Sequence, residues 1–321
     1  MIETYEETSV GKPSRDFRQV PSDLLGDVDR MQRFHALKSS AVVRCCIPLS
    51  RILTAPQAAK PGILMYHRVV PTSRHCQPTW NVTPDRFRAQ LSGLLKRGYV
   101  AWSLSQLVEA SASQESIPNN VFVVTFDDGY ANNLIHALPI LEELNVPATI
   151  FLATSYLGSK DPFPFDDWKQ KGNVDVDPDT WRALTLDETY QLLDSNLIEL
   201  GSHTHTHEDF RNRREAFRDS LSNSIDVLER EFGILNPTLS LPYGIVERGF
   251  AGPTYFATAR SLGTTCCLTT EEETVNPQDS PFGWGRFIAE QHDSADTLAV
   301  KLDGWRDTVR DRYRRLRGKP V

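Results

Sequence analysis

Two short stretches of the sequence concentrate side chains that can ionise or bind a metal ion. Asp127 and Asp128 are adjacent in TFDDGY, and GSHTHTH places three histidines at alternate positions, among them His203 and His207. Asp-Asp-Gly alone is typical of a turn, but a cluster of histidines brings no packing gain and favours metal binding. Asp128, His203 and His207 would supply one carboxylate and two imidazoles, a ligand set that leaves a position open for water.

A second carboxylate lies next to this ligand set. A metal ion lowers the pKa of its bound water and polarises a carbonyl group, while a nearby unligated carboxylate takes the proton of the water. Because successive side chains diverge, Asp128 can bind the ion while Asp127 faces the water. The pattern therefore indicates metal-assisted hydrolysis with Asp127 as the general base.

The elements that must position these residues form a repeating pattern of strands and helices. A helix after Thr83 is the clearest, since Pro84 and Asp85 occupy its first turn. Strands alternating with helices predict β-α units around a parallel sheet, and about seven strands in ~260 residues fit one barrel-like domain. The strands are predicted at residues 63–67, 98–102, 121–126, 148–153, 197–201, 238–241 and 264–269.

The candidate residues directly follow predicted strands. These residues are Asp127, Asp128, His203, His67 and Tyr243. In parallel barrels the catalytic groups gather where the strands end. We therefore expect these side chains to share one mouth of the barrel.

Composition limits the partners and the compartment. The net charge of −7 argues against a broad nucleic-acid surface. The five cysteines match neither a disulfide framework nor a C-x-x-C metal spacing, so we expect reduced, mostly buried thiols. The polar, acidic opening and the lack of a run of ~18 apolar residues favour a cytoplasmic protein. The apolar segment 36–55 leaves a membrane-surface helix or a different translation start as alternatives.

The two motifs carry a family resemblance. TFDDGY followed by a histidine motif of the form H-[ST]-x-x-H resembles the polysaccharide deacetylases of carbohydrate esterase family four. ILMYHRVV, HALPILEELNVPATIFLAT and LSLPYG are similar to the exopolysaccharide-deacetylase branch, so the resemblance covers residues 62 to about 290. It implies a distorted (β/α)7-8 barrel, here with an N-terminal extension, that uses one divalent ion.

The resemblance also implies an activity and a set of roles. Such enzymes hydrolyse N-acetyl, sometimes O-acetyl, groups of amino sugars. By position, Asp127 would be the general base, Asp128, His203 and His207 the metal ligands, and the Tyr243 backbone N–H an oxyanion donor. Thr204 would brace the second histidine or its loop, and the role of His205 stays open. Zinc is the expected ion, and iron, cobalt or nickel would also suit these ligands.

Two positions depart from the family pattern. Many members carry an arginine two residues before the proline of the third motif, where this chain has Ser240; we expect Arg286, in GWGRF, to orient the base instead. The family also has a late histidine as general acid, and no such motif follows residue 270. His67, at the end of the first strand, is favoured over His292 for this role because of its strand-end position.

Three segments are predicted: an N-terminal extension (1–60), the deacetylase-like barrel (61–297) and a C-terminal basic amphipathic helix (298–321). The last either packs on the barrel with a solvated basic end or contacts an anionic membrane surface. A long loop, residues 155–180, contains Phe163, Phe165 and Trp168; it either shapes a sugar site or packs its own aromatic rings.

The expected function is metal-dependent removal of N-acetyl groups from a poly- or oligosaccharide or a glycan precursor. The alternatives are a non-catalytic glycan-binding module of the same fold, favoured by Ser240 and the missing late histidine, and an O-acetyl esterase. The expected partner is an acetylated amino-sugar glycan, not a nucleic acid. The sequence does not indicate an oligomeric state.

Overall fold

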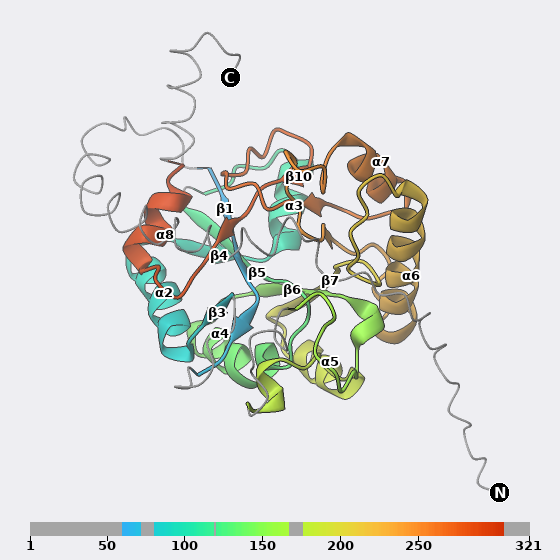
Figure 1. Cartoon of the computed structure of the whole chain (residues 1–321). Helices are drawn as coiled ribbons and strands as arrows, with labels where there is room; N and C mark the ends of the chain where they lie inside the picture. The colour runs from blue at the N-terminus through green and yellow to red at the C-terminus, as the bar shows by residue number, and fades with distance from the viewer. Residues whose placement is uncertain (1–59, 72–79, 119, 167–175, 305–321) are drawn as a thin grey trace, which may run out of the picture.

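A nine-stranded, all-parallel sheet forms the centre of the fold. The computed structural model describes residues 60–71, 80–118, 120–166 and 176–304 (Figure 1). The strands of this sheet follow the order β10-β9-β8-β7-β6-β5-β1-β11, and β4 pairs with the first half of β5. They are β1 Gly62–Tyr66, β4 Val100–Trp102, β5 Val121–Phe126, β6 Ala148–Leu152, β7 Ile198–Ser202, β8 Leu239–Ser240, β9 Cys267–Leu268, β10 Phe282–Trp284 and β11 Phe287–Ile288. A separate two-stranded sheet pairs β2 Arg68–Val69 with β3 Asn81–Val82.

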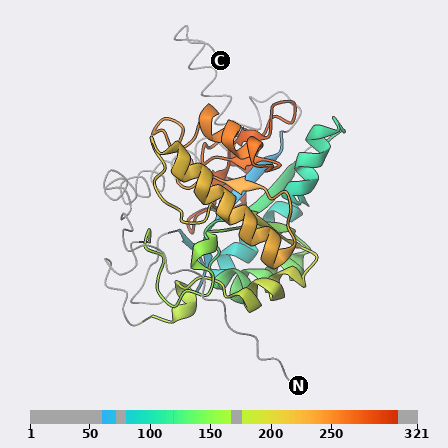
Figure 2. The same cartoon turned by 90° about the vertical axis from the view of Figure 1, so that its right-hand side faces the viewer.

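Helices surround the sheet, as the alternating sequence pattern predicts (Figures 1 and 2). Thr83 caps the first of them by accepting the Arg86 backbone N–H at 3.3 Å, which confirms the predicted helix start. The helices are α2 Pro84–Lys96, α3 Leu104–Ala112, α4 Leu138–Leu144, α5 Leu186–Leu193, α6 Arg214–Phe232, α7 Pro253–Ser261 and α8 Ala295–Leu302, with the short π-helix η1 Asn133–Ala137 and the 3-10 helices η2 Thr154–Tyr156 and η3 Pro178–Thr180.

Alternation along the strands separates two buried faces. In β5, Val124 belongs to the larger cluster that packs under α2, α4 and α5, whereas Val123 belongs to a second cluster with Leu104 and Leu107 of α3. Because side chains alternate along a strand, Thr125 and Asp127 share the face of Val123. Asp127, the general-base candidate, therefore lies directly after β5 on the face of the sheet that α3 covers.

The two ends of the curled sheet meet through one short segment. β10 pairs with β9 and β11 pairs with β1, and only Gly285 and Arg286 separate β10 from β11. A Cβ atom at Gly285 would clash with the carbonyl oxygen of Glu271, so only glycine allows the chain to turn inward there. This connection places Arg286 beside the face of β5 that carries Thr125 and Asp127. The result is the distorted parallel barrel that the sequence predicts.

Most residues of the predicted N-terminal and C-terminal segments lie outside the residues that the structure describes. The N-terminal extension up to residue 59 and residues 305–321 of the predicted basic helix lie outside the described residues. α8 covers only residues 298–302 of that predicted helix and ends at Leu302; its Leu298 and Leu302 are buried in the main cluster. Cys266 and Cys267 are free and buried, as expected for reduced thiols. Within the described ranges, no helix is both long and apolar enough to cross a membrane.

Candidate metal centre and active site

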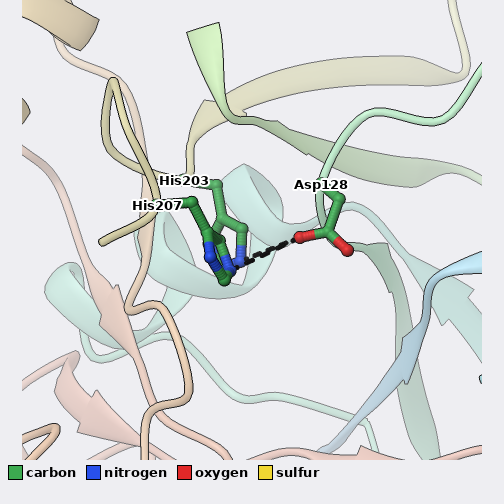
Figure 3. A group of neighbouring side chains, drawn as sticks. All are labelled: Asp128, His203 and His207. Carbon is green, nitrogen blue, oxygen red and sulfur yellow. Dashed lines mark ion pairs between the residues drawn. The ribbon is translucent and has the colours of Figure 1, made fainter. Parts of the chain in front are cut away.

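Three predicted metal ligands converge beyond the ends of β5 and β7. The Nε2 atoms of His203 and His207 each lie 3.5 Å from Oδ1 of Asp128. Figure 3 shows both imidazoles directed toward this carboxylate. All three ligand atoms lie within 4.8 Å of one another, and all three side chains are buried. The structure thus brings together the carboxylate and the two imidazoles singled out in the sequence.

Strained backbone holds these ligands in place. Asp128, Thr204, His207 and Tyr243 have φ values of 75°, 64°, 50° and 62°, in the left-handed region that non-glycine residues seldom adopt. Such outliers persist where surrounding contacts fix them, and they cluster at functional sites. Thr204 supplies one of these contacts, because its Oγ1 accepts the His207 backbone N–H at 3.1 Å. The expected bracing role of Thr204 is therefore confirmed.

The protonation of the ligand set suits a cation. Nδ1 of His203 is 2.8 Å from the carbonyl oxygen of Ser240, to which it can only donate, so Nε2 keeps its lone pair. Burial lowers the pKa of His203 and that of His207, which keeps both rings neutral. Burial, followed by the charge of Asp127, raises the pKa of Asp128 to about 8. Two lone pairs and a carboxyl group that a positive charge would ionise fit a divalent ion.

The second ligand histidine has an unusual environment. Nδ1 of His207 is buried and has no hydrogen-bond partner among the described residues. The ring of Phe165 stacks on His207 with centroids 3.7 Å apart and planes 24° apart. Nε2 is the ring nitrogen that lies 3.5 Å from Asp128, so it is the one positioned to coordinate an ion. An aromatic cover on the other side shields this ligand from water.

Arg286 clamps the general-base candidate. Its Nη1 and Nη2 donate to Oδ1 and Oδ2 of Asp127, each at 2.7 Å, and both side chains are buried. The remaining donors reach the carbonyl of Thr269, Oγ1 of Thr125 and Oγ of Ser240, so five hydrogen bonds use the five guanidinium N–H groups. Burial is the largest single effect and raises the pKa of Asp127, but the charge and hydrogen bonds of Arg286, together with the nearby His203 and His67, outweigh it and hold that pKa below its usual range.

The position of Ser240 explains how this arrangement replaces the family pattern. Ser240 Oγ accepts from Arg286 at 2.7 Å and donates to Oδ2 of Asp127 at 3.3 Å. The small side chain at residue 240 leaves space for a guanidinium that arrives from the β10–β11 segment. The contact predicted between Arg286 and Asp127 is present, while the catalytic role assigned to Arg286 stays a prediction.

The two candidates for the general acid lie in different surroundings. His67 directly follows β1, and its carbonyl oxygen accepts from Asn133 Nδ2 at 2.9 Å. Burial is the main cause that lowers the pKa of His67 to about 3; the charge of Asp127 opposes this shift and that of Arg286 adds to it. The His67 ring is therefore neutral before substrate binds, although the general-acid role predicted for it requires a protonated imidazole.

His292 belongs to a separate cluster. It lies 3.4 Å from Glu290, and these residues together with Asp293 form a second group of potential metal ligands. The Lys301 ammonium already pairs with Asp293 at 2.7 Å, so a cation has a competitor there. The charge of Asp127 acts on His67, whereas His292 is influenced by Asp293 and Lys301. This difference favours His67 as the acid.

The oxyanion-donor candidate, Tyr243, flanks the second ligand histidine. Its ring centroid lies 5.1 Å from that of His207, and its carbonyl oxygen accepts from Thr270 Oγ1 at 2.7 Å. No hydrogen bond within the described residues uses the Tyr243 backbone N–H. His205, whose role was left open, is directed elsewhere: its Nδ1 lies 2.9 Å from Thr154 Oγ1.

A buried polar cluster next to the metal ligands escaped the sequence analysis. Arg68 forms an ion pair with Asp166, and its Nη2 donates to Tyr130 Oη at 2.8 Å. Tyr130 in turn donates to Asp166 at 3.0 Å. The sequence offered one sign that these residues belong to the site: Arg68 is next to His67, and Tyr130 directly follows TFDDG. The cluster joins the long loop to the floor of the site.

The described residues of the long loop before position 167 pack against the site. Phe163 is buried against Tyr130 and Tyr156, and Phe165 lies between Phe163 and His207, with ring centroids 5.0 Å and 3.7 Å away. These two rings therefore favour the packed-lid interpretation of the loop over a sugar platform. Trp168 lies outside the described residues.

Comparisons with known proteins agree with this geometry. Residues 114–266 match the polysaccharide deacetylase family. A poly-beta-1,6-N-acetyl-D-glucosamine N-deacetylase of Escherichia coli is 31% identical over 127 residues, covering 39% of this chain and 18% of the relative. An enzyme of the same name from Staphylococcus epidermidis is 22% identical over 235 residues, covering 70% of this chain and 73% of the relative.

The solved structures show the same fold. IcaB from Ammonifex degensii superposes with a TM-score of 0.64 at 22% identity, covering 77% of this chain and 99% of IcaB. This chain spans less than a fifth of the length of the Escherichia coli relative, because the match covers 18% of it. The family match covers both ligand motifs. Residues 114–266 of this chain therefore match the polysaccharide deacetylase family, on a fold shared with solved deacetylases.

Proposed function

We propose that this chain is a metal-dependent hydrolase that removes N-acetyl groups from an amino-sugar glycan. The observation that carries the proposal is the convergence of Asp128, His203 and His207 beside a separate carboxylate, Asp127, that Arg286 holds ionised. A divalent ion bound by the three ligands would polarise the amide carbonyl and lower the pKa of a water molecule. Asp127 is then the base that accepts the proton of the attacking water.

The other residues complete the reaction. The Tyr243 N–H donates to the carbonyl oxygen as negative charge develops on it. The pKa of Asp127 is held low, so this carboxylate readily gives up the proton that it accepts. The pKa of His67 rises as negative charge develops nearby, which lets this residue pass the proton to the departing nitrogen. A carbon–oxygen bond forms, the carbon–nitrogen bond breaks, and acetate and a free amine leave.

The names of the relatives indicate a substrate to test. Zinc-loaded protein is incubated with an oligomer of β-1,6-linked N-acetylglucosamine, and acetate and primary amine are measured, with Asp127→Asn as control. Equal amounts of acetate and amine from the wild type, and neither from the variant, would support the proposal. Zinc and oligomer binding without acetate would instead support a glycan-binding module. Acetate release from an O-acetylated sugar, with no amine from the N-acetylated oligomer, would support an esterase.

A further inference from the structure

Trp80 stacks on the residue assigned as general acid. Its ring is nearly parallel to that of His67, with centroids 5.5 Å and planes 23° apart. The indole is half-buried, so part of its surface stays open to solvent while the rest lies against the imidazole. Neither the metal ligands nor the proton transfers of the proposed reaction require an aromatic ring at this position.

The backbone of Trp80 is strained and held in place. Its φ of 57° lies in the left-handed region, where a bulky residue is a genuine outlier. Its carbonyl oxygen accepts the Arg68 N–H at 3.3 Å, which ties the turn to β2 directly after His67. The next residue, Asn81, reinforces the turn: its side chain accepts from Val70 N–H at 3.0 Å and donates to the Val70 carbonyl at 3.2 Å. A rare backbone conformation that several hydrogen bonds hold in place beside a reactive group points to a functional position.

The reaction chemistry indicates what this indole meets. In an N-acetylated amino sugar the departing nitrogen is bonded directly to a carbon of the sugar ring. A residue that protonates this nitrogen must therefore lie within a few bond lengths of the ring. The carbon–hydrogen face of a pyranose is apolar, and an aromatic side chain with a polar N–H at its edge suits such a partly wet surface. Trp80 is next to His67 and partly open, so it is positioned to pack against that sugar.

We propose that Trp80 is the aromatic contact for the sugar ring that bears the acetamido group. This inference rests on the proposed function and adds to it a residue that binds substrate. The alternative is that Trp80 only shields or orients His67. The two differ in what they change: a sugar contact sets the affinity for the glycan, whereas orientation of the acid sets turnover.

The test measures affinity and turnover separately. Trp80→Ala and Trp80→Phe are made in the zinc-loaded full chain for kinetics on the β-1,6-linked N-acetylglucosamine oligomer. The same changes in an Asp127→Asn background give the dissociation constant of the intact oligomer by calorimetry. Trp102→Ala is the matched control, because it removes another half-buried indole, which packs with the α3 cluster instead.

We expect Trp80→Ala to raise the dissociation constant and the KM about tenfold and Trp80→Phe to restore most of the affinity. Trp102→Ala should lower the Tm without changing the dissociation constant. An unchanged dissociation constant with a lower kcat in both Trp80 variants would overturn the inference in favour of orientation. A wild type that binds and deacetylates no oligomer would instead refute the proposed function, and this inference with it.

Discussion

Replacing Arg286 by methionine should both destabilise the fold and stop turnover. The guanidinium is fully buried, forms two 2.7 Å bonds to Asp127, and uses its other donors on three further oxygens. Removing one partner of a buried ion pair leaves an uncompensated charge, which costs about 3–5 kcal/mol. For a chain of this size that loss lowers the Tm by roughly 10 °C. Turnover should fall about 100-fold or more, because the base loses its orientation and its charge.

The stability loss should depend on pH with a definite sign. In the wild type the pKa of Asp127 is depressed, so its contribution to stability is present above the unfolded pKa of about 3.9 and is lost as pH falls through the folded pKa. Without Arg286, burial raises the folded pKa of Asp127, and ionised Asp127 becomes a cost that grows with pH. The difference in unfolding free energy between wild type and Arg286→Met should therefore be larger at pH 8 than at pH 5.

The assay is urea unfolding of metal-free protein at both pH values, followed by kinetics of the zinc-loaded forms. Arg88→Met is the matched control, because Arg88 pairs with Glu143 at 2.9 Å on the surface, where both side chains are about half exposed. Its loss should cost at most about 1 kcal/mol, with turnover unchanged. An Arg286→Met variant with wild-type turnover, or with a stability loss no larger than that of Arg88→Met, would refute the reasoning.

Three further results are expected. His203→Ala should lose the single metal ion that the wild type keeps through dialysis, as measured by elemental analysis; full retention would argue against this ligand. Asp166→Asn should release the metal faster to a colorimetric chelator, because it breaks the buried pair with Arg68 that fixes the loop over the metal centre; an unchanged release rate would show that the loop is not such a cover. His67→Ala should lose turnover on the acetylated oligomer while keeping its metal content, whereas metal loss would mark His67 as part of the metal centre.

Much of the site could be predicted because its residues follow strands. Parallel strands end on one side of a barrel, so Asp128 and His203 had to lie near each other once β5 and β7 were recognised. The contact between Arg286 and Asp127 was also foreseeable, since the base needed a cation and Ser240 could not supply one. Local patterns thus sufficed for residues whose position follows from strand order.

Other features depend on contacts that no local pattern encodes. Asp166 meets Arg68 across 98 residues, and nothing near either position specifies the other. β10 and β11, which were not among the predicted strands, contain three and two residues, too few for a periodic signal. The left-handed backbone of Trp80 contradicts the preference of a bulky residue, so only the surrounding hydrogen bonds produce it. The protonation of His67 likewise reflects its burial, which the sequence did not show.

Anomalous diffraction from zinc-soaked crystals is the most direct test of the central claim. We expect one strong peak between Oδ1 of Asp128 and the Nε2 atoms of His203 and His207, with Asp127 outside the coordination sphere. A peak bound by Asp127 in place of Asp128, or no peak at these three side chains while zinc binds elsewhere, would contradict it.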